Sequence, residues 1–204
     1  MTQVTSSSIL YDINDKPFGI SYADWTVRWW KWWCGYEKTD PPTGVKDKDH
    51  DVFFLTTKAM LHYDYATLET DNELRSDMAI LFPVDKLLAV GFPWSDDQLL
   101  KETSKKRIDM LPNISIKLDG VELTPSRVQT PVFDLHLKRD LPKPEEPENV
   151  DKIYKGRYKK TVGEGYWIFL KPNTLSKGKH EIPAFASCKM QVLSLAVSHT
   201  LNVS

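Results

Sequence analysis

The sequence predicts a mainly β protein: an antiparallel β-sandwich of the jelly-roll type, with an N-terminal aromatic helix and one further surface helix. Two observations carry this prediction. Short apolar or alternating runs are separated by turn signals along most of the chain, and one tryptophan-rich segment has the periodicity of a helix. The length of 204 residues fits a single domain over 1–204.

The aromatic helix is predicted over Ser21–Tyr36, which holds five of the seven tryptophans. At about 100° per residue, its aromatic side chains fall within an arc of about 100° while its charged residues fall opposite. Ser21 and Asp24 resemble a capping box, and Gly35 supplies the stop. The aromatic arc is formed by Tyr22, Trp25, Trp29, Trp32, Trp33 and Tyr36, with Trp30 at its edge.

Two interpretations of this helix remain open. In the favoured one the aromatic face packs on one side of a sheet, because each ring removes about 150 to 250 Å² from water when buried. In the other, some rings stay exposed and bind a sugar or a partner protein. The candidate binding residues are then Trp25, Trp29, Trp30, Trp32 and Trp33.

Apolar runs and turn signals place the remaining elements. A second helix is predicted from a cap at Ser95 to about Asp109, with a polar outer face. The strands expected before it are Ser8–Ile13, Val52–Thr56, Met60–Leu68, Met78–Val84 and Leu87–Phe92. The strands expected after it are Ile114–Leu118, Val121–Leu123, Arg127–Leu137 (interrupted by Pro131), Gly165–Leu170, a strand through Ile182, and Lys189–Val203. The proline-rich acidic segment 141–151 is expected to be an exposed or mobile loop.

Composition limits the classes of partner. The chain has 27 basic and 28 acidic side chains, a net charge of −1, so no general field attracts nucleic acid. The apolar stretch 78–94 is interrupted by charges and prolines, so no membrane span is expected. The N-terminus lacks the features of a signal peptide, which predicts a cytoplasmic protein as the chain stands, or a secreted one if a leader has been removed. No cofactor is predicted.

One acidic loop carries a weak metal signal. Asp47, Asp49 and Asp51 alternate in the sequence as at the start of a calcium loop. The later Gly and Glu of an EF-hand are missing, and Lys46 and Lys48 offset the charge. A solvated loop is the favoured interpretation, with a calcium site as the alternative.

The histidines offer a second weak metal signal. His62, His136 and His199 lie in predicted strands, where cross-strand pairing could bring two together as in jelly-roll metal sites. Asp134 shares a strand face with His136 and is the least improbable acid and base pair, while His180 is expected to bond locally. The chain has none of the hydrolase, zinc-protease or phosphate-loop motifs. A catalytic residue is therefore not assigned.

The two cysteines, Cys34 and Cys188, lie far apart in the sequence and form no metal-binding spacing. Two buried free thiols are the favoured prediction, with a disulfide as the alternative.

Several motifs together resemble a family of uncharacterised bacterial and archaeal proteins, many of them predicted to be secreted. The helix contributes Tyr22-x-x-Trp25-x-x-x-Trp29-Trp30-x-Trp32. The further motifs are Val52-x-Phe54-Leu55, Leu81-Phe82-Pro83-Val84, Leu118-Asp119-Gly120, Gly165-Tyr166-Trp167 and Gly178-x-His180-x-Ile182. The resemblance covers most of the chain and implies a β-sandwich fold, and it implies no activity. Compared with many of these relatives, the chain is expected to have no leader, and it does not have the cysteines that some of them carry after the aromatic helix and before the Phe-Pro motif.

Three hypotheses for function follow. The favoured one is a non-enzymatic β-sandwich module that binds or assembles, which includes a homo-oligomer. The second is a carbohydrate-binding module that uses exposed tryptophans and the loop around Asp47 to Asp51. The third is a jelly-roll metal-dependent enzyme that uses His62, His136 or His199.

Overall fold

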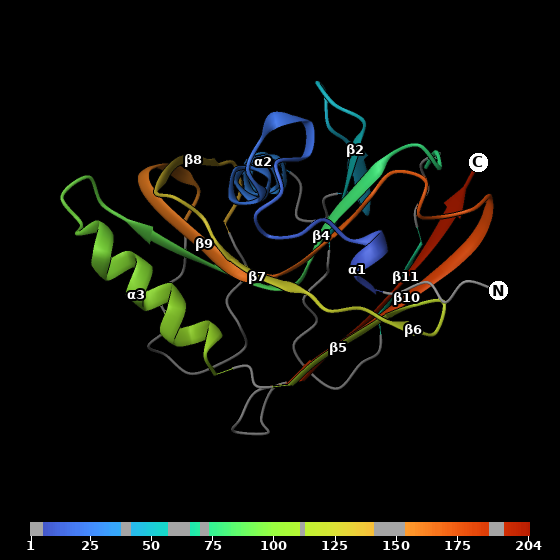
Figure 1. Cartoon of the computed structure of the whole chain (residues 1–204). Helices are drawn as coiled ribbons and strands as arrows, with labels where there is room; N and C mark the ends of the chain where they lie inside the picture. Colours follow the sequence, from blue (N-terminus) through green and yellow to red (C-terminus); the bar gives the residue numbers. More distant parts are fainter. Residues whose placement is uncertain are drawn as a thin grey trace.

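The computed structural model describes residues 6–37, 42–56, 66–69, 74–110, 113–140, 154–187 and 194–204. Over these ranges the protein is mainly β, and two β-sheets pack face to face as predicted (Figure 1). The predicted loop 141–151, together with His62 and Cys188, lies outside the described residues.

The larger sheet has the strand order β1-β2-β4-β9-β7, and β8 also pairs with β9. Its central strands are β4 and β9, which pair antiparallel along most of their length, while β2 and β4 run parallel. The strands are β1 (Gly44–Lys46), β2 (Val52–Leu55), β4 (Ala79–Gly91), β7 (Ser126–Gln129), β8 (Phe133–Leu137) and β9 (Gly156–Leu170).

The smaller sheet has the order β3-β11-β10-β5-β6. Its antiparallel pair β10 and β11 is joined at one edge by β3, which runs parallel to β11. The strands are β3 (Ala66–Glu69), β5 (Asn113–Leu118), β6 (Val121–Glu122), β10 (Gly178–Ser187) and β11 (Ser194–Val203). Apolar side chains such as Phe82, Ile116 and Ile182 fill the space between the two sheets.

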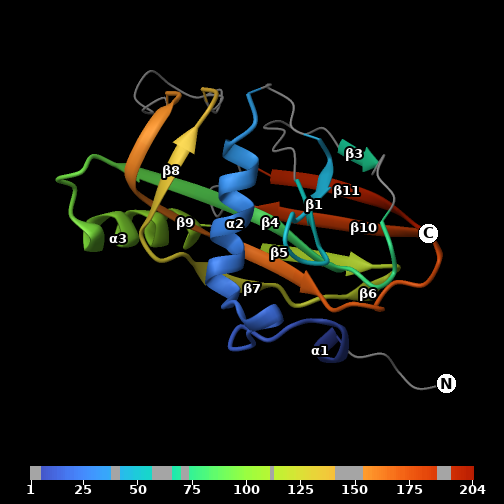
Figure 2. The ribbon, with the colours of Figure 1, turned by 90° about the horizontal axis from the view of Figure 1, so that it is seen from above.

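The helix α2 (Tyr22–Cys34) lies across the outer face of the larger sheet (Figures 1 and 2). Its tryptophans pack against Phe54, Trp167 and Phe169 in a second core, on the opposite side of the sheet from the first. The Ser21 hydroxyl accepts the Asp24 N–H, which confirms the predicted start of the helix. The favoured interpretation of the aromatic face, packing on a sheet, is thus confirmed.

The helix α3 (Asp97–Ile108) packs at one end of the larger sheet, against β4 and β9 (Figure 1). Its N-cap is Asp96, whose carboxylate accepts the Leu99 N–H, and not Ser95 as the sequence predicted. Ser95 belongs to the preceding turn, where its hydroxyl accepts the Phe92 N–H. Asp can cap as well as Ser, so the capping residue moved by one position without changing the helix.

Several strand boundaries differ from the prediction. The segment predicted as the strand Ser8–Ile13 begins instead with the short helix α1 (Ser6–Ile9), followed by a single bridge from Leu10 to Leu170. The two strands predicted within 78–92 form one strand, β4. Its pairing with β9 shifts register just after Pro83, which accommodates a residue that has no N–H to donate to the sheet. The strand predicted over 127–137 divides at Pro131 into β7 and β8.

Candidate functional site

Burial removes most of the helix tryptophans from consideration as a ligand surface. Trp25, Trp29 and Trp30 are buried, and Trp32 and Trp33 are half-buried. The prediction that the first three bind a ligand through exposed rings is therefore wrong for this structure, because their indoles have no free surface. A binding role for Trp32 and Trp33 stays a prediction.

Polar contacts hold the aromatic layer in one arrangement. The indole N–H of Trp25 donates to the Pro17 carbonyl at 2.9 Å, and that of Trp29 donates to the Leu55 carbonyl at 2.7 Å. At the C-terminal end of α2, the Arg139 guanidinium donates to the carbonyls of Trp33 and Tyr36. The Trp33 carbonyl lies in the last turn of α2, where the helix leaves carbonyls without partners, and Tyr36 follows the helix end, so Arg139 both caps the helix and complements its dipole.

A lysine and a thiol lie within the same layer. The Nζ atom of Lys86, on β4, lies 5.2 Å from the ring centre of Trp29 and 5.3 Å from that of Trp33. Burial lowers the pKa of Lys86 to about 8, although the nearby groups of Asp85 and Cys34 act in the opposite direction. Cys34 is a buried free thiol whose pKa burial raises to about 12, which makes it a poor nucleophile.

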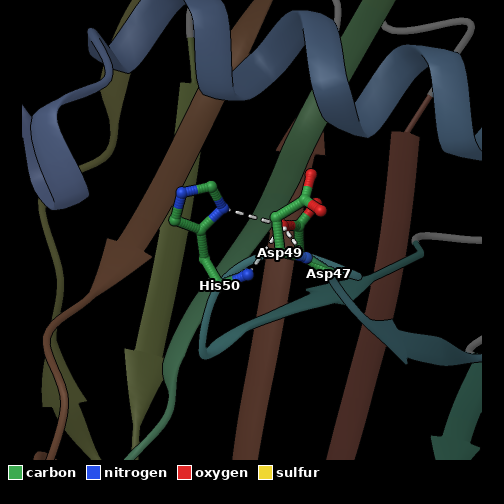
Figure 3. A group of neighbouring side chains, drawn as sticks. All are labelled: Asp47, Asp49 and His50. Atoms are coloured by element: carbon green, nitrogen blue, oxygen red, sulfur yellow. Dashed lines mark hydrogen bonds and ion pairs between the residues drawn. The ribbon is translucent and has the colours of Figure 1, made fainter.

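The acidic loop between β1 and β2 brings Asp47, Asp49 and His50 together below α2 (Figure 3). One ligand atom from each of the three lies within 4.8 Å of the other two, a spacing that a cation could bridge. His50 was not among the sequence-predicted ligands. Asp51 does not belong to this group, because its carboxylate pairs with Lys46 at 2.7 Å and with Arg75 at 3.0 Å.

Contacts within the protein engage the Asp47 carboxylate of this cluster. Its carboxylate is nearly buried and accepts the backbone N–H groups of Asp49 and His50, both at 3.1 Å. The imidazole of His50 contacts the same oxygen at 3.0 Å, and Arg28 of α2 lies 3.4 Å from both Asp47 and Asp49. These contacts fold the loop and fasten it to α2, so the arrangement fits a structural role, and the calcium site stays a prediction.

The predicted strand histidines are not brought together where they are described. His136 is exposed on β8 of the larger sheet, and His199 is fully buried on β11 of the smaller sheet. Asp134 and His136 do share an exposed face, but Asp134 pairs with Lys31 at 3.5 Å. The structure therefore does not bring these two histidines together, and a metal site that includes His62 stays a prediction, because His62 lies outside the described residues.

His180 takes part in an arrangement that resembles a catalytic triad in composition. Its Nδ1 lies 2.6 Å from the Asp119 carboxylate, and its Nε2 lies 3.5 Å from the Ser176 hydroxyl. However, Nε2 is closer to the Ser176 carbonyl, at 2.9 Å, and a carbonyl requires it to donate a proton. Both ring nitrogens are then donors, so His180 has no lone pair with which to activate the serine. We call these contacts the His180 clamp, because they hold the turn at Asp119 against β10.

An exposed aromatic pair on the turn between β4 and α3 was missed by the sequence reasoning. The rings of Phe92 and Trp94 stack with centres 5.0 Å apart and an angle of 5° between their planes. Phe92 is 63% exposed and Trp94 is 80% exposed, whereas the other tryptophans are buried or half-buried. We call this pair the Phe92–Trp94 platform. The turn signal around Pro93 could have indicated that both rings leave the core.

The turn that carries the platform is held by its own hydrogen bonds. The Phe92 N–H donates to the Ser95 hydroxyl, the Ser95 N–H donates to the Phe92 carbonyl, and both distances are 2.9 Å. Lys160, on β9, donates to the Ser95 carbonyl at 2.7 Å and pairs with Asp97 at 2.7 Å. A Cβ at Gly91 would come within 2.9 Å of Ser95 and Leu100, so the glycine lets the turn close on α3.

The helix that follows the platform is anchored by a buried polar network. Glu164, on β9, is 3% exposed and accepts from Arg127 at 2.8 Å, from Ser104 of α3 at 2.9 Å and from Gln129 at 2.7 Å. Arg127 also contacts Asp109 at the end of α3, at 2.6 Å. The Glu164 carboxylate thus accepts from three side chains, and the network fixes α3 on the sheet.

Comparisons with known proteins do not assign the chain to a family. No family model, curated protein or solved structure matches the chain. The resemblance to the family of uncharacterised bacterial and archaeal proteins therefore stays a prediction. No helix among the described residues is long and apolar enough to cross a membrane.

Proposed function

We propose that the protein is a non-enzymatic binding module, in which the sandwich and α2 form a rigid frame and the Phe92–Trp94 platform is the contact surface. The carrying observation is the parallel stack of two rings that are 63% and 80% exposed on a hydrogen-bonded turn. Exposed aromatics of this kind contribute most of the free energy at many binding surfaces. Because the turn is already ordered, binding there costs little conformational entropy.

The burial of the other aromatics supports this choice of surface. Trp25, Trp29 and Trp30 stabilise the fold and offer nothing to a ligand. Neither ring nitrogen of His180 is free to act as a base, and His136 and His199 lie on different sheets. The described histidines therefore support an enzyme less well than the platform supports a binding module. The proposed function is based on Phe92 and Trp94 because, among the described residues, these two rings stack on each other while both remain exposed.

The test compares the wild-type chain with Trp94→Ala and with the control Phe185→Ala. Phe185 is an exposed aromatic on β10, in the other sheet, with 43% of its surface accessible. Each protein is examined by light scattering over a wide concentration range for self-association, and on glycan and peptide arrays for ligands. We expect an association of the wild type that Trp94→Ala removes and Phe185→Ala keeps. An association that Trp94→Ala leaves intact, or no association in any of the three measurements, would contradict the proposal.

A further inference from the structure

We infer that the ligand of the Phe92–Trp94 platform is a neutral saccharide whose pyranose ring stacks on the outer face of the Trp94 indole. This inference rests on the proposed function and names the chemical class of its ligand. Three features of the turn lead to it: the shape of the platform, its area, and the polar groups beside it.

The first feature is shape. Phe92 covers one face of the Trp94 indole, because the two rings stack nearly parallel. Trp94 as a whole is nevertheless 80% exposed, so the other face of its indole is open to solvent. The result is a flat platform about one ring wide. The C–H groups on one face of a pyranose form a patch of similar size, and they suit the electron-rich face of an indole.

The second feature is area. A buried aromatic side chain covers about 150 to 250 Å², so rings that are 63% and 80% exposed present about 300 Å² together. A stable protein–protein interface needs about 800 Å² from each partner. The platform ends at Asp96 and Asp97, which begin directly after the turn and are exposed. Its size therefore favours a small ligand over a second copy of the chain.

The third feature is the mixture of polar groups beside the rings. Lys160 lies 2.7 Å from the carbonyl of Ser95, the residue next to Trp94, and pairs with Asp97 through one carboxylate oxygen. Gln98, in the first turn of α3, is exposed and donates its amide to Glu102. Sugar hydroxyls donate and accept, and so match such a mixed set. The acids next to the turn disfavour an anionic ligand or an anionic membrane surface.

The test is titration of the full chain with soluble oligosaccharides, followed by calorimetry and by tryptophan fluorescence with iodide as quencher. The probes are β-1,4-linked oligomers of glucose, xylose and N-acetylglucosamine and the α-1,4-linked glucose oligomer. We expect saturable binding of at least one probe and protection of the quenchable emission. Trp94→Ala should weaken binding by about 30-fold or more, as for a central aromatic at a binding surface. Trp94→Tyr should recover part of it, and Phe185→Ala should change it less than twofold.

The outcomes separate the inference from the proposed function. If Trp94 governs binding of a second copy, a peptide or a lipid vesicle while none of the probes binds, the saccharide inference is overturned and the proposed function stands. If a saccharide binds equally well to Trp94→Ala, the platform is not its site, and both are overturned. Circular dichroism of each variant confirms the fold, and the exposed position of Trp94 makes misfolding a minor concern.

Discussion

The imidazole of His199 lies 5.7 Å from the ring of Phe82 in the core between the two sheets, and neither of its nitrogens has a hydrogen-bond partner among the described residues. Burial, with a smaller effect of the Lys86 charge, lowers the pKa of His199 to about 4. The folded protein therefore keeps this histidine neutral at pH values where the unfolded chain protonates it.

This relationship predicts a loss of stability in weak acid. Because the pKa is lower in the folded state than the usual value of about 6.5, the stability present above about pH 6.5 falls as the pH approaches 4. The loss from this group is about 3 kcal/mol. Urea unfolding at a series of pH values measures it. In His199→Leu the slope between these pH values should decrease, and stability at neutral pH should rise, since two unpartnered nitrogens are removed. An unchanged slope would contradict the assignment.

The Glu164 network predicts that replacing this one carboxylate with an amide lowers the free energy of unfolding strongly. In Glu164→Gln, an amide NH₂ would face the donors of Arg127, Ser104 or Gln129. We expect a loss of about 3 kcal/mol in the free energy of unfolding, because buried donors lose their acceptor. Glu122→Gln is the matched control: Glu122 is exposed and contacts Lys117 at 3.9 Å, so its loss should stay below about 1 kcal/mol. Equal effects of the two changes would refute the role of the network.

The contact of Gly163 with Trp30 predicts a steric defect. A Cβ at residue 163 would overlap the buried indole of Trp30. Gly163→Ala should therefore destabilise the protein by about 1 to 3 kcal/mol through overpacking. Trp30→Leu opens space beneath α2, so Gly163→Ala should lower the free energy of unfolding by a smaller amount in that background than in the wild type. Thermal unfolding of the four proteins gives the coupling, and additive effects would mean that the two residues do not share this contact.

The His180 clamp predicts a pH dependence of opposite sign to that of His199. Burial lowers the pKa of His180, but the contacts with Asp119 and the Ser176 carbonyl outweigh it and raise the pKa overall. The contribution to stability is then complete below about pH 6.5 and is lost as the pH rises through the higher folded value. The clamp is near the surface, so the effect should be below about 1 kcal/mol. Asp119→Asn should lower the His180 pKa in an NMR titration. No change in that titration would disprove the clamp.

The fold was predictable where local pattern and burial agree. The aromatic helix has one apolar face and a serine cap, and both signals depend on neighbours within a few residues. The sequence analysis did not predict the first half of β9, because Arg157, Lys159 and Lys160 make this segment too polar to show an apolar strand face. These residues form a strand because β4 and β8 supply hydrogen-bonding partners distant in the chain.

The candidate site was less predictable for a related reason. Trp94 follows an apolar strand and appears in the sequence as the end of a buried segment. Its exposure depends on how the turn closes between β4 and α3, through Lys160 from another strand. Conversely, Trp25 and Trp29 were plausible ligand contacts until the sheet beneath them was known. Composition identified the aromatic residues, and tertiary packing decided which of them face water.

The most direct measurement of which indoles face water is quenching of tryptophan emission by acrylamide in the wild type and in Trp94→Phe. Trp94 is 80% exposed, whereas Trp32 and Trp33 are half-buried and the remaining α2 indoles and Trp167 are buried. We therefore expect the wild type to show a red-shifted, readily quenched component, and Trp94→Phe to lose this component and keep a blue-shifted, poorly quenched spectrum. A red-shifted, readily quenched component that persists in Trp94→Phe would show that the α2 tryptophans face water and would contradict both the frame and the platform.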